Sequence, residues 1–316
     1  MTELSTVSSP IASVATSSKE IQAEVDAAYI FEENFMIICF PLGILGIIGN
    51  GIIAYLFFYM IENSRFTVYF QTINIANMTV LINHFIYFFR YFFEWDISAF
   101  ALHIIEMLEV LGYNTRFYIL TAICVERYVM IFYPVCDKRY RPQYFSVMVT
   151  GALGALSCAI TLANDLTCLT HFYATFDEFV VICSMTSILR LIIEILILLT
   201  SMVLSTVAIL ISMKRQQTSP ARLDITIVAT VLLFLLTDTP IRVTDVILFW
   251  IEGANSFAFT VAVHMFDTIN CMVIPLIFLT VGCWKRASEP ISKFLERAVQ
   301  FEETMEERTE ADKEQA

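Results

Sequence analysis

Charged residues are scarce in this sequence. Asp, Glu, Lys and Arg make up only 16% of its 316 residues, 58% are hydrophobic, and the mean hydropathy is +0.71. Soluble domains carry about 25% charged residues. The composition therefore excludes an ordinary soluble domain and indicates an integral membrane protein.

Basic residues are scarcer than acidic ones. The chain has 19 Lys and Arg against 31 Asp and Glu, which gives a formal net charge of -12. Nucleic acid is bound by basic faces, so this balance argues against a nucleic-acid partner. Much of the acid falls in two stretches, 20–33 and 302–314, as solvated charge usually does.

Clustered metal ligands are also missing. No Cys-x-x-Cys pair occurs among the eight cysteines, and the four histidines are far apart in the sequence: His84, His103, His171 and His264. We therefore expect no metal site and no cofactor. The sequence contains no nucleophile–base pair that would indicate an enzyme. Its two halves show none of the symmetry that is typical of transporters.

Long apolar runs are what the sequence does have. A helix needs about 20 residues to cross about 30 Å of hydrocarbon, and seven runs are long enough: 35–60, 66–91, 99–132, 144–166, 184–213, 222–250 and 257–283. The sequence therefore predicts an all-α membrane protein, a seven-transmembrane helix bundle over residues 34–284. An apolar face at helical spacing in 285–300 predicts a short amphipathic helix on the membrane surface after the seventh span.

The distribution of Lys and Arg predicts the orientation of the bundle. Basic residues occur in the first, third and fifth connections and after the last span, whereas the alternate loops contain none. The N-terminus is therefore expected outside the plasma membrane and the C-terminus in the cytoplasm. Residues 1–33, which are Ser/Thr-rich and acidic, predict a disordered extracellular tail, and residues 301–316 predict an acidic, disordered cytoplasmic tail.

The stretch 112–142 contains a candidate switch. It begins as an apolar span and reaches Glu126-Arg127-Tyr128 near the expected cytoplasmic surface, followed by Tyr133-Pro134. An acid next to an arginine there would hold the guanidinium until another helix end moves and frees it for a partner. The alternative is that these charges simply snorkel to the interface at the end of a span.

Short motifs distributed over the spans carry a resemblance to a known family. They are Gly49-Asn50-Gly51, Phe66-Thr67-Val68-Tyr69, Gly112-Tyr113-Asn114-Thr115, Val125-Glu126-Arg127, Tyr133-Pro134, Arg141-Pro142, Arg222-Leu223, Pro240-Ile241-Arg242 and Val281-Gly282. In these motifs the chain resembles the rhodopsin-like (class A) G-protein-coupled receptors, and among them the Mas and Mas-related receptors. The resemblance implies a receptor that binds an extracellular ligand and activates heterotrimeric G proteins.

The cysteines and the seventh span refine this resemblance. No cysteine lies between Cys39 and Cys124, and the resemblance implies a disulfide between Cys168 and Cys183, with two free thiols as the alternative. Where most rhodopsin-like receptors have Asn-Pro-x-x-Tyr, the seventh span reads Ile274-Pro275-Leu276-Ile277-Phe278. This departure leaves open a non-signalling receptor, a decoy or a partner of another receptor. The predicted switch residues are Glu126, Arg127, Tyr128, Pro134, Pro275 and Phe278.

Arg116 predicts a buried polar network. It lies eleven residues before Arg127, which returns it to nearly the same helix face, about 17 Å further from the cytoplasm. A guanidinium at that depth needs an acid, and Asp238 and Asp267 lie at a matching height. We expect Arg116 to take the place of the sodium ion that many rhodopsin-like receptors hold near this level, with simple bracing of the bundle as the alternative. The predicted network is Asn50, Asn77, Arg116, Asp238, Asp267 and Asn270.

Acidic and aromatic residues predict a ligand site at the outer mouth. Glu109 lies eighteen residues before Arg127, which is five whole turns, and therefore shares its inward face. Surplus carboxylate concentrates cations, and aromatic rings add cation–π contacts. We therefore expect a basic peptide or amine as ligand, although the acids could instead be solvated loop charges. The predicted ligand residues are Glu106, Glu109, Tyr113, Asp165, Asp245, Tyr87, Tyr91 and Trp250.

Overall fold

The computed structural model describes residues 10–59, 65–135, 139, 141–142, 144–168, 176–215, 221–250 and 257–283. The side chains at 10–29, 31–32, 35, 176–179, 244–250 and 257–262 are outside this description. The predicted amphipathic helix at 285–300 and the tail at 301–316 also lie outside the described residues. Over the described ranges the chain consists of helices and short connections.

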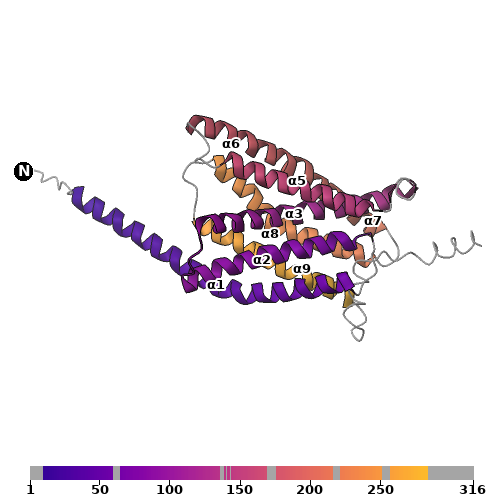
Figure 1. Ribbon diagram of the computed structural model, residues 1–316, viewed down its shortest axis with the longest axis horizontal. Coiled ribbons are helices and arrows are strands. Elements are labelled where there is room, and N and C mark those ends of the chain that lie inside the picture. The colour runs from indigo at the N-terminus through magenta and orange to yellow at the C-terminus, as the bar shows by residue number, and fades with distance from the viewer. Residues whose placement is uncertain are drawn as a thin grey trace, which may run out of the picture.

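Within these ranges the helices form a bundle of seven rods (Figure 1). Six rods are single helices: α1 (Pro10–Tyr59), α2 (Thr67–Phe93), α3 (Ala99–Phe132), α5 (Phe145–Thr167), α8 (Arg222–Trp250) and α9 (Phe257–Cys283). The remaining rod is α6 (Phe176–Leu191), continued by the π-helix η2 (Ile192–Leu199) and by α7 (Thr200–Arg215). These bounds follow the predicted spans closely, except that the first and fifth rods begin earlier than predicted.

Most of the rods are apolar enough to cross a membrane. Six segments are long enough and sufficiently hydrophobic: Met36–Tyr59, Thr67–Phe93, Phe145–Thr167, Val180–Arg215, Arg222–Val243 and Val263–Gly282. The remaining rod, α3, is more polar because it carries Glu109, Arg116 and Glu126. It packs against α2, α5 and α7, and both Arg116 and Glu126 are buried. The apolar helices therefore shield the most polar one.

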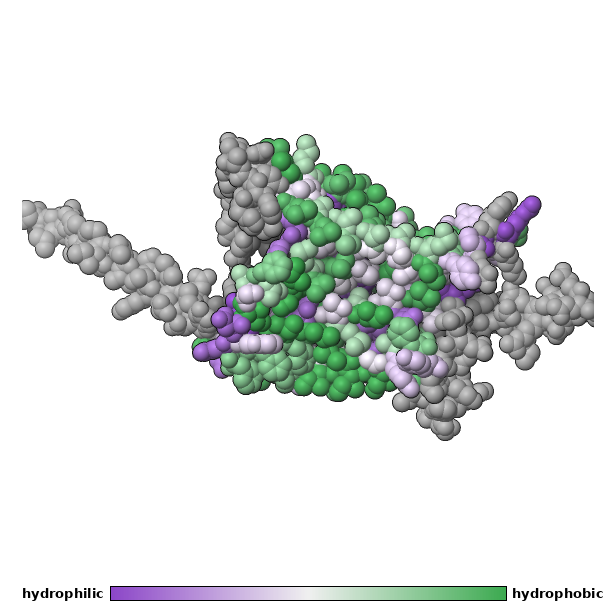
Figure 2. All heavy atoms as spheres, in the orientation of Figure 1, coloured by the Kyte–Doolittle hydropathy of each residue, from purple (hydrophilic) through white to green (hydrophobic). Residues whose placement is uncertain are grey.

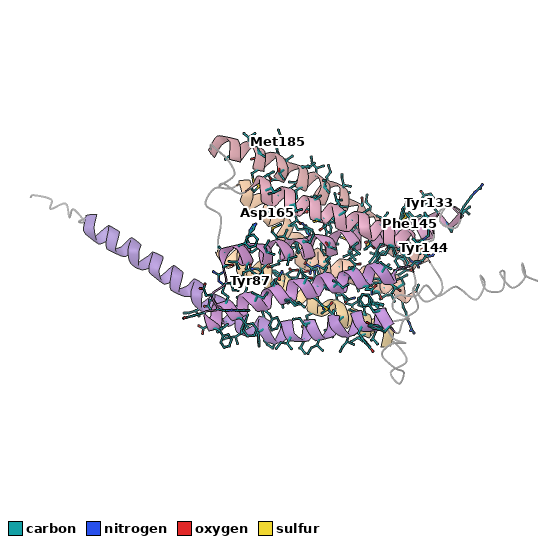
Figure 3. All side chains as sticks on the ribbon, viewed as in Figure 1. Tyr87, Tyr133, Tyr144, Phe145, Asp165 and Met185 are labelled. Carbon is teal, nitrogen blue, oxygen red and sulfur yellow. A yellow bond between two sulfur atoms is a disulfide. The ribbon has the colours of Figure 1, made fainter. Side chains whose placement is uncertain are left out.

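The outer surface of the bundle suits a lipid environment. Figure 2 shows hydrophobic side chains over the middle of the bundle, with hydrophilic residues toward its two ends. Leu236, Met185 and Leu204 are 73%, 69% and 65% exposed, and Figure 3 shows Met185 on the outside of α6. Lipid tails are as apolar as these side chains, so such exposure is stable in a bilayer. The chain is a multi-pass membrane protein.

The polar residues lie at different heights between the two ends of the bundle. We name the end that carries Tyr87 and Asp165 the outer end, and the end that carries Tyr133 and Tyr144 the inner end (Figure 3). Between them, α3 and α2 approach closely at Gly112, where an added Cβ would lie 3.0 Å from Val80 Cγ2 and 3.2 Å from the Ala76 carbonyl oxygen. A larger residue at Gly112 would therefore push these two helices apart.

The start of α1 differs from the sequence-based expectation. The composition predicts a disordered tail over 1–33, but α1 begins at Pro10 and its N-terminal part projects beyond the other rods (Figure 1). Proline is favoured at the first position of a helix, and no Pro or Gly follows it before Pro41. The intervening Ala, Glu, Gln and Lys residues have high helix propensity. The Ser/Thr-rich, acidic composition obscured this local preference.

The disulfide that the resemblance implies is present. Cys168, directly after α5, is bonded to Cys183 of α6, with their Cα atoms 4.9 Å apart. The bond closes a connection with a sequence separation of 15 and ties these two rods together near the outer end.

Candidate functional site

Arg116 is the centre of a buried polar core. Its side chain on α3 is 1% exposed, and Nη2 donates hydrogen bonds to Asp238 Oδ2 on α8, at 2.7 Å, and to Asp267 Oδ1 on α9. Nη1 donates to Asn77 Oδ1 on α2 at 3.4 Å. A buried cation requires such partners. One guanidinium therefore links α3 to three other helices.

Asparagine side chains extend this core toward α1 and α9. Asn77 donates from Nδ2 to Asn50 Oδ1 at 3.0 Å, and Asn50 donates to the carbonyl oxygen of Cys271 at 2.8 Å. On the opposite side, Asn270 donates to Asp238 Oδ1 at 2.6 Å. The structure thus brings all six predicted network residues into one connected, buried cluster.

A second buried ion pair lies one turn nearer the outer end. Arg242 of α8 donates from Nη1 to Glu194 Oε2 of η2 at 2.8 Å and to Asn114 Oδ1 at 3.2 Å. The ring of Tyr113 lies beneath this guanidinium, with Cζ of Arg242 3.9 Å from the ring centre, and Cζ of Arg116 is 5.4 Å from the same ring centre. Tyr113, a predicted ligand residue, therefore lies close to both Arg116 and Arg242.

Three side chains near the outer end form a compact cluster, which we name the His–Glu–His cluster: His84 of α2, Glu109 of α3 and His264 of α9. His84 Nε2 lies 3.1 Å from Glu109 Oε1, and His264 Nδ1 lies 3.2 Å from the same oxygen. The two ring nitrogens are 3.2 Å apart. The side chains of His84 and Glu109 are 13% and 14% exposed, and that of His264 is 31% exposed. The predicted cation-binding carboxylate therefore already contacts two histidines.

The other predicted ligand residues are more dispersed. Tyr87 is half-buried, and its ring centre lies 5.8 Å from that of His264. Asp165, at the end of α5, pairs with His103 Nε2 at 3.2 Å. Figure 3 shows Tyr87 and Asp165 toward the same end of the bundle. Of the rest, Glu106 is exposed, Tyr91 is half-buried, and the side chains of Asp245 and Trp250 lie outside the described part of the chain.

At the inner end, Arg127 is bound by an acid of α8. Its Nε and Nη2 donate to Asp224 Oδ1 and Oδ2 at 2.5 and 3.0 Å. Glu126 instead pairs with Arg141 and accepts a hydrogen bond from the Tyr69 hydroxyl at 2.7 Å. The expectation that Glu126 restrains Arg127 is therefore corrected. Adjacent residues of a helix project about 100° apart, so the two side chains reach different partners.

The remaining predicted switch residues are mainly packing residues in this structure. Phe278 is fully buried, with its ring centre 4.9 Å from that of Phe70 and 6.2 Å from that of Phe57. A tyrosine at this position would bring a hydroxyl into an apolar contact. Of the others, Pro275 is buried within α9, Tyr128 is half-buried and Pro134 is exposed.

Comparison with known proteins points to one family. No protein-family model matches the chain. Human proto-oncogene Mas is 28% identical over 277 residues, which cover 85% of this chain and 83% of that protein. Rat Mas-related G-protein coupled receptor member D is 24% identical over 82% of this chain and 84% of its own length, and mouse member H is 26% identical over 86% and 84%.

The chain resembles the Mas receptors. Each match extends over most of both proteins, so the resemblance to Mas and Mas-related receptors concerns the bundle as a whole rather than one short motif. Two of these relatives are named as G-protein coupled receptors, and such relatives support a bundle of membrane-spanning helices like that of the structure.

Four residues of this Mas-like chain take part in the clusters although the sequence patterns did not single them out: Asp224, Glu194, His84 and His264. Glu194 is the one acid in the apolar run Ile192–Leu199, and an ionisable residue inside a span is by itself a functional signal. Asp224 stands in the first turn of α8. The two histidines carry no comparable signal, because they are far apart in the sequence and meet only through helix packing.

Proposed function

We propose that the chain is a G-protein-coupled receptor of the Mas-related type, which binds a cationic peptide or amine at its outer end and activates heterotrimeric G proteins at its inner end. The N-terminus is outside the cell and the C-terminus is cytoplasmic. The observation that carries this proposal is the buried ion pair between Arg127 of α3 and Asp224 of α8. An ion pair between two helices at the inner end is suited to a switch, because relative movement of the helices breaks it.

Three buried ion pairs that involve α8 give a physical basis for coupling the two ends. α8 contributes Asp224, Asp238 and Arg242, and each of them binds a side chain on another rod. A ligand that binds one arrangement of the outer ends more tightly than another shifts the population toward that arrangement. Because α8 reaches all three levels, its displacement changes the contact at Asp224 and frees Arg127 for a G protein.

The charge of the outer end supports a cationic ligand. Glu106 and Glu109 belong to α3 and Asp165 lies in the last turn of α5, whereas the buried Arg242 is engaged by Glu194. Carboxylates in a partly enclosed site raise the local concentration of cations. Tyr87 adds an aromatic face beside Glu109 and its histidine partners.

Agonist-dependent nucleotide exchange tests this proposal directly. Purified receptor in lipid nanodiscs is combined with purified G proteins, and a panel of basic peptides and amines is screened for accelerated guanine-nucleotide exchange. We expect at least one cationic compound to bind and to accelerate exchange. A compound that binds the outer end while every G protein remains unaffected would instead establish a non-signalling receptor.

Glu109→Gln should weaken the response to cationic agonists. The substitution keeps the size of the side chain and removes its charge, and a hydrogen bond to a charged group is worth about 1.5–3 kcal/mol, so we expect potency to fall by about tenfold or more. The measurement is the agonist concentration at half-maximal exchange. Glu94→Gln, at an exposed position after α2, is the matched control and should leave potency unchanged. Equal potency of every cationic agonist on Glu109→Gln and the unaltered receptor would contradict the ligand assignment.

A further inference from the structure

The His–Glu–His cluster brings three potential metal ligands from three helices to one point. The relevant atoms are His84 Nε2, Glu109 Oε1 and His264 Nδ1, whose mutual distances are 3.1, 3.2 and 3.2 Å. The two imidazole rings are nearly perpendicular, with an interplanar angle of 89°, so each presents its nitrogen edge rather than its face. All three atoms therefore converge on a shared centre.

The hydrogen bonds around His84 determine which of its nitrogens carries a lone pair. When the hydroxyl of Thr268 donates its hydrogen to the carbonyl oxygen of His264, at 2.8 Å, its oxygen accepts from His84 Nδ1, at 3.0 Å. A neutral His84 then has its proton on Nδ1 and a lone pair on Nε2. That lone pair faces the Glu109 carboxylate and His264. Three electron-rich atoms at such distances repel one another unless a proton or a metal cation lies between them, and a metal cation can contact all three at once.

The spacing of the three atoms fits zinc. Zn²⁺ binds imidazole nitrogen and carboxylate oxygen at about 2.0–2.2 Å in tetrahedral geometry, which places neighbouring ligand atoms about 3.3 Å apart. The three observed separations are close to this value. The contact from His84 Nδ1–H to Thr268 also matches the outer hydrogen bond that normally orients a zinc-bound histidine.

We infer that His84, Glu109 and His264 form a zinc-binding site at the outer end of the bundle. Two imidazoles and one carboxylate suit zinc better than Ca²⁺ or Mg²⁺, which prefer oxygen ligands alone. Three protein ligands leave the fourth position of the tetrahedron for water or for a donor atom of another molecule. The ion links α2, α3 and α9. Zinc binding requires neither an agonist nor a G protein, so its test is separate from that of the proposed function, but zinc and a cationic agonist would compete for the Glu109 carboxylate.

Zinc binding to the purified full-length receptor tests the site. Receptor in detergent is titrated with Zn²⁺ in competition with a chromogenic chelator, and X-ray absorption at the zinc edge identifies the bound atoms. We expect one tightly bound zinc per chain with nitrogen and oxygen ligands. His84→Ala and His264→Ala should each weaken binding at least about 100-fold, and Thr268→Val should weaken it about 10–100-fold, as loss of an outer partner does.

His103→Ala is the matched control. It removes an imidazole that also pairs with a carboxylate, Asp165, but lies outside the cluster, so zinc affinity should be unchanged. Size-exclusion chromatography shows whether each variant is folded, and the absorption spectrum of the unaltered receptor gives the ligand set even where a variant aggregates. Unchanged affinity in folded His84→Ala and His264→Ala, sulfur ligands at about 2.3 Å, or no bound zinc would overturn the inference.

Discussion

At the scale of single residues, Arg116 has the most demanding environment. One guanidinium faces two buried carboxylates, Asp238 and Asp267, in a part of the bundle that excludes solvent. Hydrogen bonds from Asn270, and from Arg116 to Asn77 and to the Cys271 sulfur, add further contacts around them. The cost of burying each charge is offset by the opposite charges beside it. The group is therefore stable when it is complete, and the loss of one member destabilises the others.

Arg116→Met should therefore destabilise the receptor strongly. It leaves two carboxylates buried without their cation, and breaking a buried pair in this way costs about 3–5 kcal/mol. The measurement is the unfolding temperature of purified receptor together with its amount at the cell surface. Adding Asp238→Asn and Asp267→Asn to the same chain removes the unpaired charge and should restore part of the loss. A single variant as stable as the unaltered receptor would show that the ion pairs contribute little.

Arg116 also predicts that the affinity for agonist does not depend on sodium. Arg116 already supplies a positive charge beside Asn77, whose side chain is uncharged. A sodium ion there would meet a guanidinium and an uncharged amide, so we expect agonist affinity to be the same in sodium chloride and in choline chloride of equal ionic strength. A strong shift of affinity with sodium would contradict the replacement and would favour a bracing role alone.

At the scale of helices, two adjacent charged residues of α3, Arg127 and Glu126, bind different neighbouring elements at the inner end. Arg127 binds across to α8 through Asp224, whereas Glu126 faces Tyr69 of α2 and Arg141 of the following connection. Two adjacent residues of α3 thus fix this helix to two different neighbours. Movement of α8 breaks the first contact without requiring the second to change.

Asp224→Asn should raise basal signalling. Loss of the carboxylate charge weakens the hold of α8 on Arg127, and a coupling of about 1–3 kcal/mol corresponds to about 5–150-fold in the equilibrium between two states. Basal nucleotide exchange, measured without agonist, should therefore increase, and we expect about tenfold. Asp96→Asn, at an exposed position before α3, is the matched control. Basal exchange that stays at the level of the control would show that this ion pair does not restrain activation.

At the scale of the whole molecule, the bundle has its polar side chains inside and its apolar side chains outside. Side chains such as Leu236 and Met185 face outward, while Arg116 and Glu194 are almost fully enclosed. This arrangement is stable only where the surroundings are apolar, and it places the His–Glu–His cluster and the Arg127–Asp224 pair at opposite ends. A signal between them must therefore cross the membrane through the helices.

Epitope tags should report this orientation. An antibody against a tag at the N-terminus should label intact cells, and one against a tag at the C-terminus should label them only after permeabilisation, because the basic connections favour the cytoplasmic side. Labelling is measured by flow cytometry on cells that express each tagged chain. The reverse pattern would place Arg127 outside the cell and would contradict the proposed coupling.

The sequence predicted the elements of this fold better than their contacts. Apolar length and loop charge are local properties, so spans such as Arg222–Trp250 could be predicted almost to the residue. Arg116 could be matched with Asp238 and Asp267 because few acids lie at that depth. The partner of Arg127 and the meeting of His84 with His264 depend on how each helix is rotated about its axis, and that rotation follows from packing of the whole bundle.

The π-helix η2 shifts the helical phase of α7 relative to that of α6. Its N–H groups bond to carbonyl oxygens five residues back instead of four, so the segment Ile192–Leu199 winds more loosely than α6 and α7 on either side. The side chains of α7 are therefore out of phase with a repeat counted from Phe176. An alignment with a receptor whose fifth helix is regular throughout needs a single-residue gap within η2, and without it every position from Thr200 to Arg215 is assigned to the wrong face.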